Sequence, residues 1–169
     1  MSVVLLAAVF SVTRFFASDN KRQNGEKNKM SEDSALAKEK NGVVIVLDAG
    51  HGGRDPGKVG VDGQLEKDIN LEITLTLAEL LKSSGYEVIL TRESDVSTDD
   101  VETDKIITRK KSDLKNRLEL MKNNPDAIFI SIHLNKFTTS SAFGSQVFYS
   151  DNDKAKALGD YIQHSIVNL

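Results

Sequence analysis

Two histidines and a glutamate are the residues of this sequence best suited to hold a metal ion. His51 stands in the segment DAGHGG and His133 in SIHLN, each at the end of an apolar stretch. Two imidazoles and one carboxylate are sufficient protein ligands for a catalytic zinc, which keeps its fourth position for water. Such a zinc lowers the pKa of its bound water to about 7 and polarises a carbonyl group. This is the chemistry of amide hydrolysis.

The residues alone leave the identity of the carboxylate open. Glu66 is the first candidate, because it begins a long predicted helix after a glycine-rich loop, but Asp68 and Glu72 compete for the role. Acidic residues are favoured in a first helical turn in any case, because they complement the helix dipole. The chain has no cysteine, which excludes thiolate ligands. His164, the third histidine, falls in the last predicted helix and is expected at the surface.

The loop between the first histidine and this helix is rich in glycine, and glycine lets a backbone fold closely over a site. It could instead cradle a phosphate group at the start of the helix. However, the loop matches neither GxxxxGK[ST] nor GxGxxG at a short strand-to-helix turn. A later acidic segment, residues 93–107, lacks the spacing of a calcium-binding EF-hand. We expect this segment to be a solvated loop.

Apolar runs and helical periodicities alternate along the rest of the chain. They predict strands over residues 43–47, 86–91, 127–132 and 145–149, and helices over 66–84, 108–123 and 151–169. This order indicates an α/β fold with a mostly parallel sheet flanked by helices in three layers. Ligands bind to such sheets at the carboxyl ends of the strands. His51 and His133 both follow predicted strands, so we expect them at that edge.

The N-terminal region predicts export. Residues 3–12 form an apolar run that is too short to span a bilayer but suits a signal peptide. The alternative is a buried amphipathic helix. Residues 17–42 are too polar to pack as a core. We therefore expect an incomplete signal peptide or membrane anchor over residues 1–16, a polar linker over 17–42, a domain over 43–169, and a location in the cell envelope.

Composition limits the classes of partner. The sequence is 39% hydrophobic and 28% charged, as in ordinary soluble globular proteins. Its net charge is −3 and its pI about 5.6. A nucleic-acid-binding domain is usually basic or carries a basic stripe, so no nucleic-acid partner is expected.

Three segments, VVIVLDAGHGGRDPG, LEKDINLEI and FISIHLN, together resemble the zinc-dependent N-acetylmuramoyl-L-alanine amidases of the type 3 class. The resemblance implies that His51, Glu66 and His133 hold one zinc per chain. It implies peptidoglycan as substrate and hydrolysis of the amide between the lactyl group of N-acetylmuramic acid and L-alanine. Weaker candidates for contact with substrate or with the zinc ligands are Arg54, Gln64 and Asn135.

The N-terminal layout, without cell-wall-binding repeats, looks most like the spore-cortex maturation amidases. It implies action in the cortex or forespore intermembrane space during sporulation, with any accessory partner unknown. The family takes its general base, a glutamate, from a block like E-x-G-F-x-S-N, and no such block occurs up to Leu169. We therefore expect a C-terminally truncated catalytic domain, without the family's last strand and helix and with little activity.

Two hypotheses that assign the chain to other functional classes stay open. The first is a non-catalytic module that binds zinc and peptidoglycan but lacks the general base. The second is an unrelated α/β protein that binds an anionic small molecule at the glycine-rich loop. Two measurements, the release of peptides from peptidoglycan and the zinc content of the chain, would distinguish these hypotheses from the amidase.

Overall fold

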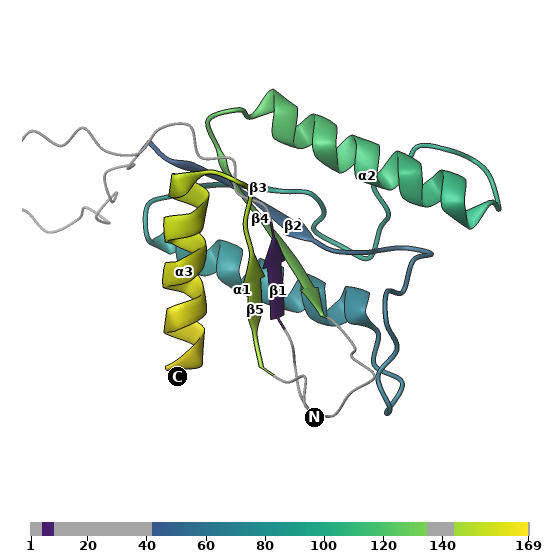
Figure 1. The fold of residues 1–169 in the computed structure, drawn as a ribbon. Helices are drawn as coiled ribbons and strands as arrows, with labels where there is room; N and C mark the ends of the chain where they lie inside the picture. Colours follow the sequence, from purple (N-terminus) through teal and green to yellow (C-terminus); the bar gives the residue numbers. More distant parts are fainter. Residues whose placement is uncertain (1–4, 9–41, 135–143, 169) are drawn as a thin grey trace, which may run out of the picture.

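The computed structural model describes residues 5–8, 42–134 and 144–168. Strands and helices alternate along most of this part of the chain (Figure 1). The helices agree with the predicted ranges to within two residues at each end. In chain order the elements are β1 (Leu5–Ala8), β2 (Val44–Ala49), α1 (Glu66–Ser83), β3 (Glu87–Leu90), α2 (Ile106–Asn123), β4 (Ile128–Leu134), β5 (Gln146–Phe148) and α3 (Asp153–Val167).

The strands form one sheet in the order β3-β2-β4-β1-β5. Its centre is parallel, because β2 pairs in parallel with both β3 and β4. β1 runs antiparallel to β4 and parallel to β5. The prediction of an α/β fold with a mostly parallel sheet is therefore confirmed, and the parallel centre is the part that carries both candidate histidines.

Helices cover opposite faces of β2, which gives the expected three layers (Figure 1). Side chains alternate along a strand, so neighbouring residues face opposite sides of the sheet. Leu47 packs with Ala78 of α1 on one face, whereas Val46 packs with Leu120 and Met121 of α2 on the other. Both strand residues are completely buried. This is why β2 is apolar without alternation.

Helix α1 turns a stripe of polar residues towards the sheet near the candidate site. Its buried residues are Glu66, Asn70, Thr74 and Ala78, spaced four apart. Leu80, near the end of the helix, is 61% exposed. The polar members bond to groups at the strand ends and within the helix. The first half of α1 is thus built to position a site.

The N-terminal apolar run contributes a strand to the sheet. β1 lies between β4 and β5, with Leu6 opposite His133. The sequence had placed this run outside the domain, but an extended apolar segment can also cover an exposed strand edge. Residues 9–41, which include most of the predicted linker, lie outside the described residues. Export and the boundaries of the N-terminal regions stay predictions. None of the helices in the described ranges is long and apolar enough to cross a membrane.

Candidate metal centre

The two histidines meet at the carboxyl edge of the parallel strands. β2 ends at Ala49, and the backbone N–H of Gly50 continues the pairing by donating to Ile132 at 3.0 Å. His51 follows two residues after the strand, whereas His133 lies inside β4 and not after it as predicted. The imidazole centroids are 4.9 Å apart and the rings are inclined at 79°. The expected convergence at one edge is confirmed.

Glu66 supplies the carboxylate between the two rings. Its Oε1 lies 3.1 Å from His51 Nε2 and 3.3 Å from His133 Nδ1. Asp68 and Glu72, the competing candidates, are exposed on α1. The structure thus brings together the three residues that the family resemblance selected.

These three side chains fit a zinc ion. Their ligand atoms all lie within 4.8 Å of one another. Ligand distances near 2.1 Å and tetrahedral angles place two zinc ligands roughly 3.4 Å apart, which matches both separations from Glu66. The carboxylate is also fixed in place, because Oε2 accepts the backbone N–H of Lys58 at 2.8 Å and Oε1 that of Leu134 at 3.0 Å.

Hydrogen bonds between the carboxylate and the two imidazoles hold the centre together. Burial raises the pKa of Glu66, but hydrogen bonds from His133 and His51 outweigh burial and hold this pKa far below its usual range. Burial lowers the pKa of His51, but its hydrogen bonds to Glu66 and Asp55 outweigh that effect and raise the pKa. A bound metal cation would replace the protons that the imidazoles share with the carboxylate, so metal binding releases protons.

Asp55 orients the first histidine. Its Oδ2 lies 2.9 Å from His51 Nδ1, which leaves Nε2 to face Glu66. Such a carboxylate–histidine pair fixes the ring orientation of a metal ligand and makes the ligand more basic. No pattern in the sequence indicated a role for Asp55. Its separation of four residues from His51 gave no helical signal, because the chain turns at His51 with φ of +64°.

Two buried arginines hold the backbone that carries His51. Arg92 donates to the carbonyls of Ala49 at 2.9 Å and Gly50 at 3.1 Å. Arg117 donates to Ala49 at 3.0 Å and to the carbonyl of His51 at 2.9 Å. Three consecutive carbonyls therefore accept hydrogen bonds from guanidinium groups. Arg92 lies in the connection between β3 and α2, and Arg117 lies in α2. We call this pair of side chains the arginine clamp.

The Arg117 side of the clamp is anchored by two aspartates. Arg117 pairs with Asp48 of β2 and, at 2.7 Å, with Asp113 one helical turn earlier. Asp48 also accepts from the hydroxyls of Thr91 and Ser131. Burial lowers the pKa of Arg117, but the two carboxylates outweigh burial and raise it. No motif in the sequence pointed to the clamp, because its members come from distant segments.

The three weaker candidates lie elsewhere or outside the described residues. Arg54 is 69% exposed and pairs with Asp104 at 3.3 Å. Gln64 is exposed, and its backbone carbonyl accepts the N–H of Gly60 at 2.8 Å. Asn135 lies outside the described residues. Roles for these three in substrate binding stay predictions.

A methyl group at Gly50 is expected to damage the centre without unfolding the chain. A Cβ at this position would lie 2.3 Å from Cε1 of His133 and 2.4 Å from its Nε2. Because His133 must then move, Gly50→Ala should lose roughly 10–100-fold in zinc affinity, the range known for disturbed partners of metal ligands. Competition with a chromogenic chelator measures this.

Gly60→Ala is the matched control in the same loop. Its Cβ would lie 3.0 Å from the flexible side chain of Asp62 and at the ordinary van der Waals distances of 3.4 and 3.7 Å from Gln64. Gly60 is not among the glycines with positive φ. Equal zinc affinity in the two variants would show that His133 is not confined by the backbone at Gly50.

Comparison with known proteins identifies the family of this chain. Residues 45–169 match the family described as N-acetylmuramoyl-L-alanine amidase. The chain is 38% identical over 132 residues to the germination-specific N-acetylmuramoyl-L-alanine amidase of Bacillus subtilis, covering 75% of this chain and 55% of that protein. It is 32% identical over 120 residues to the amidase AmiA of Escherichia coli, covering 70% of this chain and 37% of that protein.

A solved structure shows the same fold. The amidase CwlD from Clostridioides difficile, determined in complex with the GerS lipoprotein, superposes with a TM-score of 0.66 and 45% sequence identity. The match covers 73% of this chain and 64% of that one. The chain spans only about half, or less, of the length of the curated relatives described above. Because the family match covers most of the chain, this protein belongs to the N-acetylmuramoyl-L-alanine amidase family.

Proposed function

We propose that this protein hydrolyses the amide between N-acetylmuramic acid and L-alanine in peptidoglycan, with one zinc ion held by His51, Glu66 and His133. The observation that carries the proposal is the convergence of these three side chains, with all ligand atoms within 4.8 Å. Family membership supports the bond that is cut. The donor set supports the choice of zinc.

The residues of the chain prepare the centre for this reaction. When bound there, zinc would supply a hydroxide nucleophile at neutral pH and stabilise the charge that develops on the carbonyl oxygen. Asp55 orients His51, and two backbone N–H groups orient Glu66. The arginine clamp fixes the backbone that enters the centre. Preorganised groups need no rearrangement during the reaction, which is where their catalytic advantage lies.

Relatives favour the spore cortex as the substrate and an exported protein as the location. One relative is named for germination, and CwlD was solved with a lipoprotein. We propose that this protein likewise acts on cortex peptidoglycan outside the cytoplasm, with a lipoprotein as accessory partner. The apolar N-terminal run is the segment that would direct export or anchor the protein at a membrane.

Release of stem peptides from purified cortex peptidoglycan tests the function. The zinc-loaded chain should liberate peptides with a free L-alanine N-terminus, which mass spectrometry detects, and Glu66→Ala should not. Release with added lipoprotein alone would support the partner as well. Sedimentation with peptidoglycan but no release under either condition would contradict hydrolysis and support the non-catalytic binding module.

A further inference from the structure

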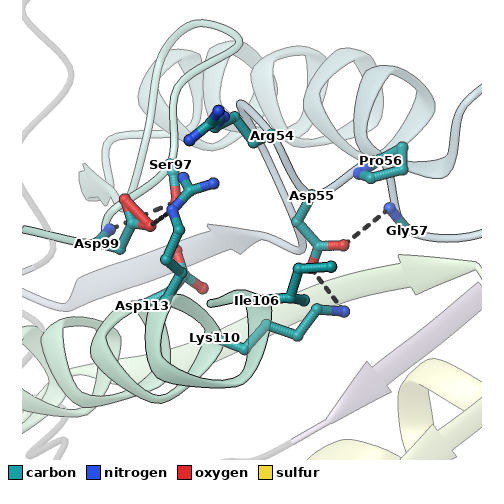
Figure 2. Close-up of a pocket in the computed structure, with 10 residues that line it drawn as sticks. Arg54, Asp55, Pro56, Gly57, Ser97, Asp99, Ile106, Lys110 and Asp113 are labelled. Carbon is teal, nitrogen blue, oxygen red and sulfur yellow. Dashed lines mark hydrogen bonds and ion pairs between the residues drawn. The ribbon is translucent and has the colours of Figure 1, made fainter. Parts of the chain in front are cut away.

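A cavity of about 250 Å³ lies beside the candidate metal centre, between the glycine-rich loop and the first half of α2. Figure 2 shows Arg54, Asp55 and Pro56 on the loop side, and Ile106 and Lys110 on the helix side. Pro56 and Ile106 provide apolar wall, and the other three provide charge. The cavity is large enough for a small polar group of a ligand.

The cavity and the metal centre share a wall. Asp55 Oδ2 lies 2.9 Å from His51 Nδ1 on one side and 3.2 Å from Lys110 Nζ on the other. Figure 2 shows the Asp55 carboxylate directed between the loop and Lys110. One extended molecule could therefore place one group at the metal centre and another in the cavity.

The carboxylates that line the cavity are already engaged. Asp99 pairs with Arg109 at 2.6 Å. Asp113 accepts from Arg117 at 2.7 Å and from the Thr98 hydroxyl at 2.6 Å. Asp55 is shared by His51, Lys110 and the backbone N–H of Gly57. Each of these carboxylates therefore already has a cationic side chain as a partner.

Three cations line the cavity, Arg54, Arg109 and Lys110. Arg109 is mostly buried and pairs with Asp99, whereas Arg54 and Lys110 are more exposed and have N–H donors outside their ion pairs. A guanidinium carries five N–H donors and an ammonium three. Arg54 pairs through one nitrogen with Asp104, whose side chain is 96% exposed, and such surface pairs are weak. Lys110 is half exposed and pairs with Asp55. Because its carboxylates are in ion pairs and N–H donors of Arg54 and Lys110 remain available, the cavity suits a ligand that accepts hydrogen bonds and carries negative charge.

We propose that Arg54 and Lys110 form a subsite for a free carboxylate of the stem peptide whose amide lies at the metal centre. The proposal rests on the function proposed above and adds the substrate class, an acidic peptide and not a neutral one. Guanidinium and ammonium groups bind carboxylates through charge-assisted hydrogen bonds, which are the strong ones. The cavity would therefore determine which peptidoglycan chemistry the enzyme prefers.

The test compares two muropeptides that differ only in charge. One carries free peptide carboxylates, and in the other they are carboxamides of the same shape. The unsubstituted chain should prefer the acidic substrate by roughly tenfold in kcat/KM, the factor expected for a modest charge-assisted hydrogen bond. Arg54→Gln and Lys110→Gln should each lower this preference several-fold. Lys115→Gln, on α2 but not in the cavity lining, should keep it.

Each outcome decides one of the two proposals. Hydrolysis of both substrates at equal rates, or a preference that survives in Arg54→Gln and Lys110→Gln, overturns the subsite. No hydrolysis of either substrate by zinc-loaded protein overturns the proposed function instead. In that case calorimetric binding of the same two muropeptides decides the subsite, and equal affinities overturn it.

Discussion

Replacing His51, Glu66 or His133 with alanine is expected to remove zinc from the chain, whereas the unsubstituted chain should retain about one zinc ion after dialysis. Each side chain provides one of the three protein ligand atoms. Loss of a ligand should exceed the roughly 10–100-fold loss of affinity caused by disturbing a ligand's partner. Release of stem peptides should fall to background in all three variants, because the nucleophile and the oxyanion stabilisation both depend on the metal.

Asp68→Ala and His164→Ala are the matched controls for these substitutions. Asp68 is an exposed acid two residues along the same helix from Glu66, and His164 is an exposed histidine on α3. Both variants should keep the zinc content of the unsubstituted chain. Metal analysis of the dialysed proteins, with circular dichroism to confirm folding, measures the result.

Two results would contradict this assignment. If Asp68→Ala lost zinc while Glu66→Ala kept it, the carboxylate ligand would be wrong. If the unsubstituted chain folded but bound no zinc, the cluster would be a hydrogen-bonded group of histidines and a glutamate. Hydrolysis by such a zinc-free chain would then require a different catalytic centre.

The histidines were predictable because their positions follow from patterns that a sequence displays directly. Apolar runs identify buried strands, and the edge of a parallel sheet at which ligands bind is a general property of the fold. For Glu66, the helix was predictable from the sequence, but the choice of this residue over Asp68 as the metal ligand came from the resemblance to a family. The structure explains that choice, since Glu66 is buried and faces the sheet whereas Asp68 is exposed.

The supporting residues were not predictable from the sequence. Arg92 and Arg117 reach the carbonyls of residues 49–51 from 42 to 68 positions away. A single arginine after a strand or within a helix has the pattern of an ordinary surface residue. Asp55 is close to His51 in the chain, but their contact depends on a left-handed turn that no periodicity indicates. Local patterns predict elements, whereas these contacts depend on how the elements are assembled.

The contacts of the acidic segment before α2 were also not predictable from the sequence. Its composition predicted a solvated loop. In the structure Asp95 accepts the backbone N–H of Gly53 at 2.8 Å and pairs with Lys67. Asp100 bonds to Ser112, and Asp99 pairs with Arg109. The segment is thus tied to the glycine-rich loop and to α2, and so forms part of the cavity beside the metal centre.

Replacing Arg117 with methionine is expected to destabilise the fold by about 3–5 kcal/mol, because it leaves buried carboxylates without their partner. Arg117 is only 7% exposed and Asp48 5%. Against a typical stability of roughly 5–15 kcal/mol, this is a large fraction. The free energy of unfolding of Arg117→Lys should lie between those of the unsubstituted chain and Arg117→Met. Lysine keeps the charge but not the planar guanidinium, which reaches several acceptors at once. Urea denaturation measures the free energy of unfolding.

A second substitution separates the stability of the fold from the position of His51. Asp48→Asn in the Arg117→Met background removes one unpaired buried charge and should recover much of the lost stability. The carbonyls of Ala49 and His51 still lack the donors that Arg117 supplied. Zinc affinity should therefore stay low in the double variant although the fold is restored. Lys115→Met, which breaks only an exposed pair with Glu119, should change neither quantity appreciably.

The two measurements together decide what the clamp does. Recovery of both stability and zinc affinity in the double variant would mean that Arg117 acts only through the charge of Asp48. Unfolding of Arg117→Met at the same urea concentration as Lys115→Met would mean that the buried network contributes nothing to stability. The expected combination is restored stability with weak zinc binding. That combination would make Arg117 a positioning residue, one that acts on the metal through the backbone of His51.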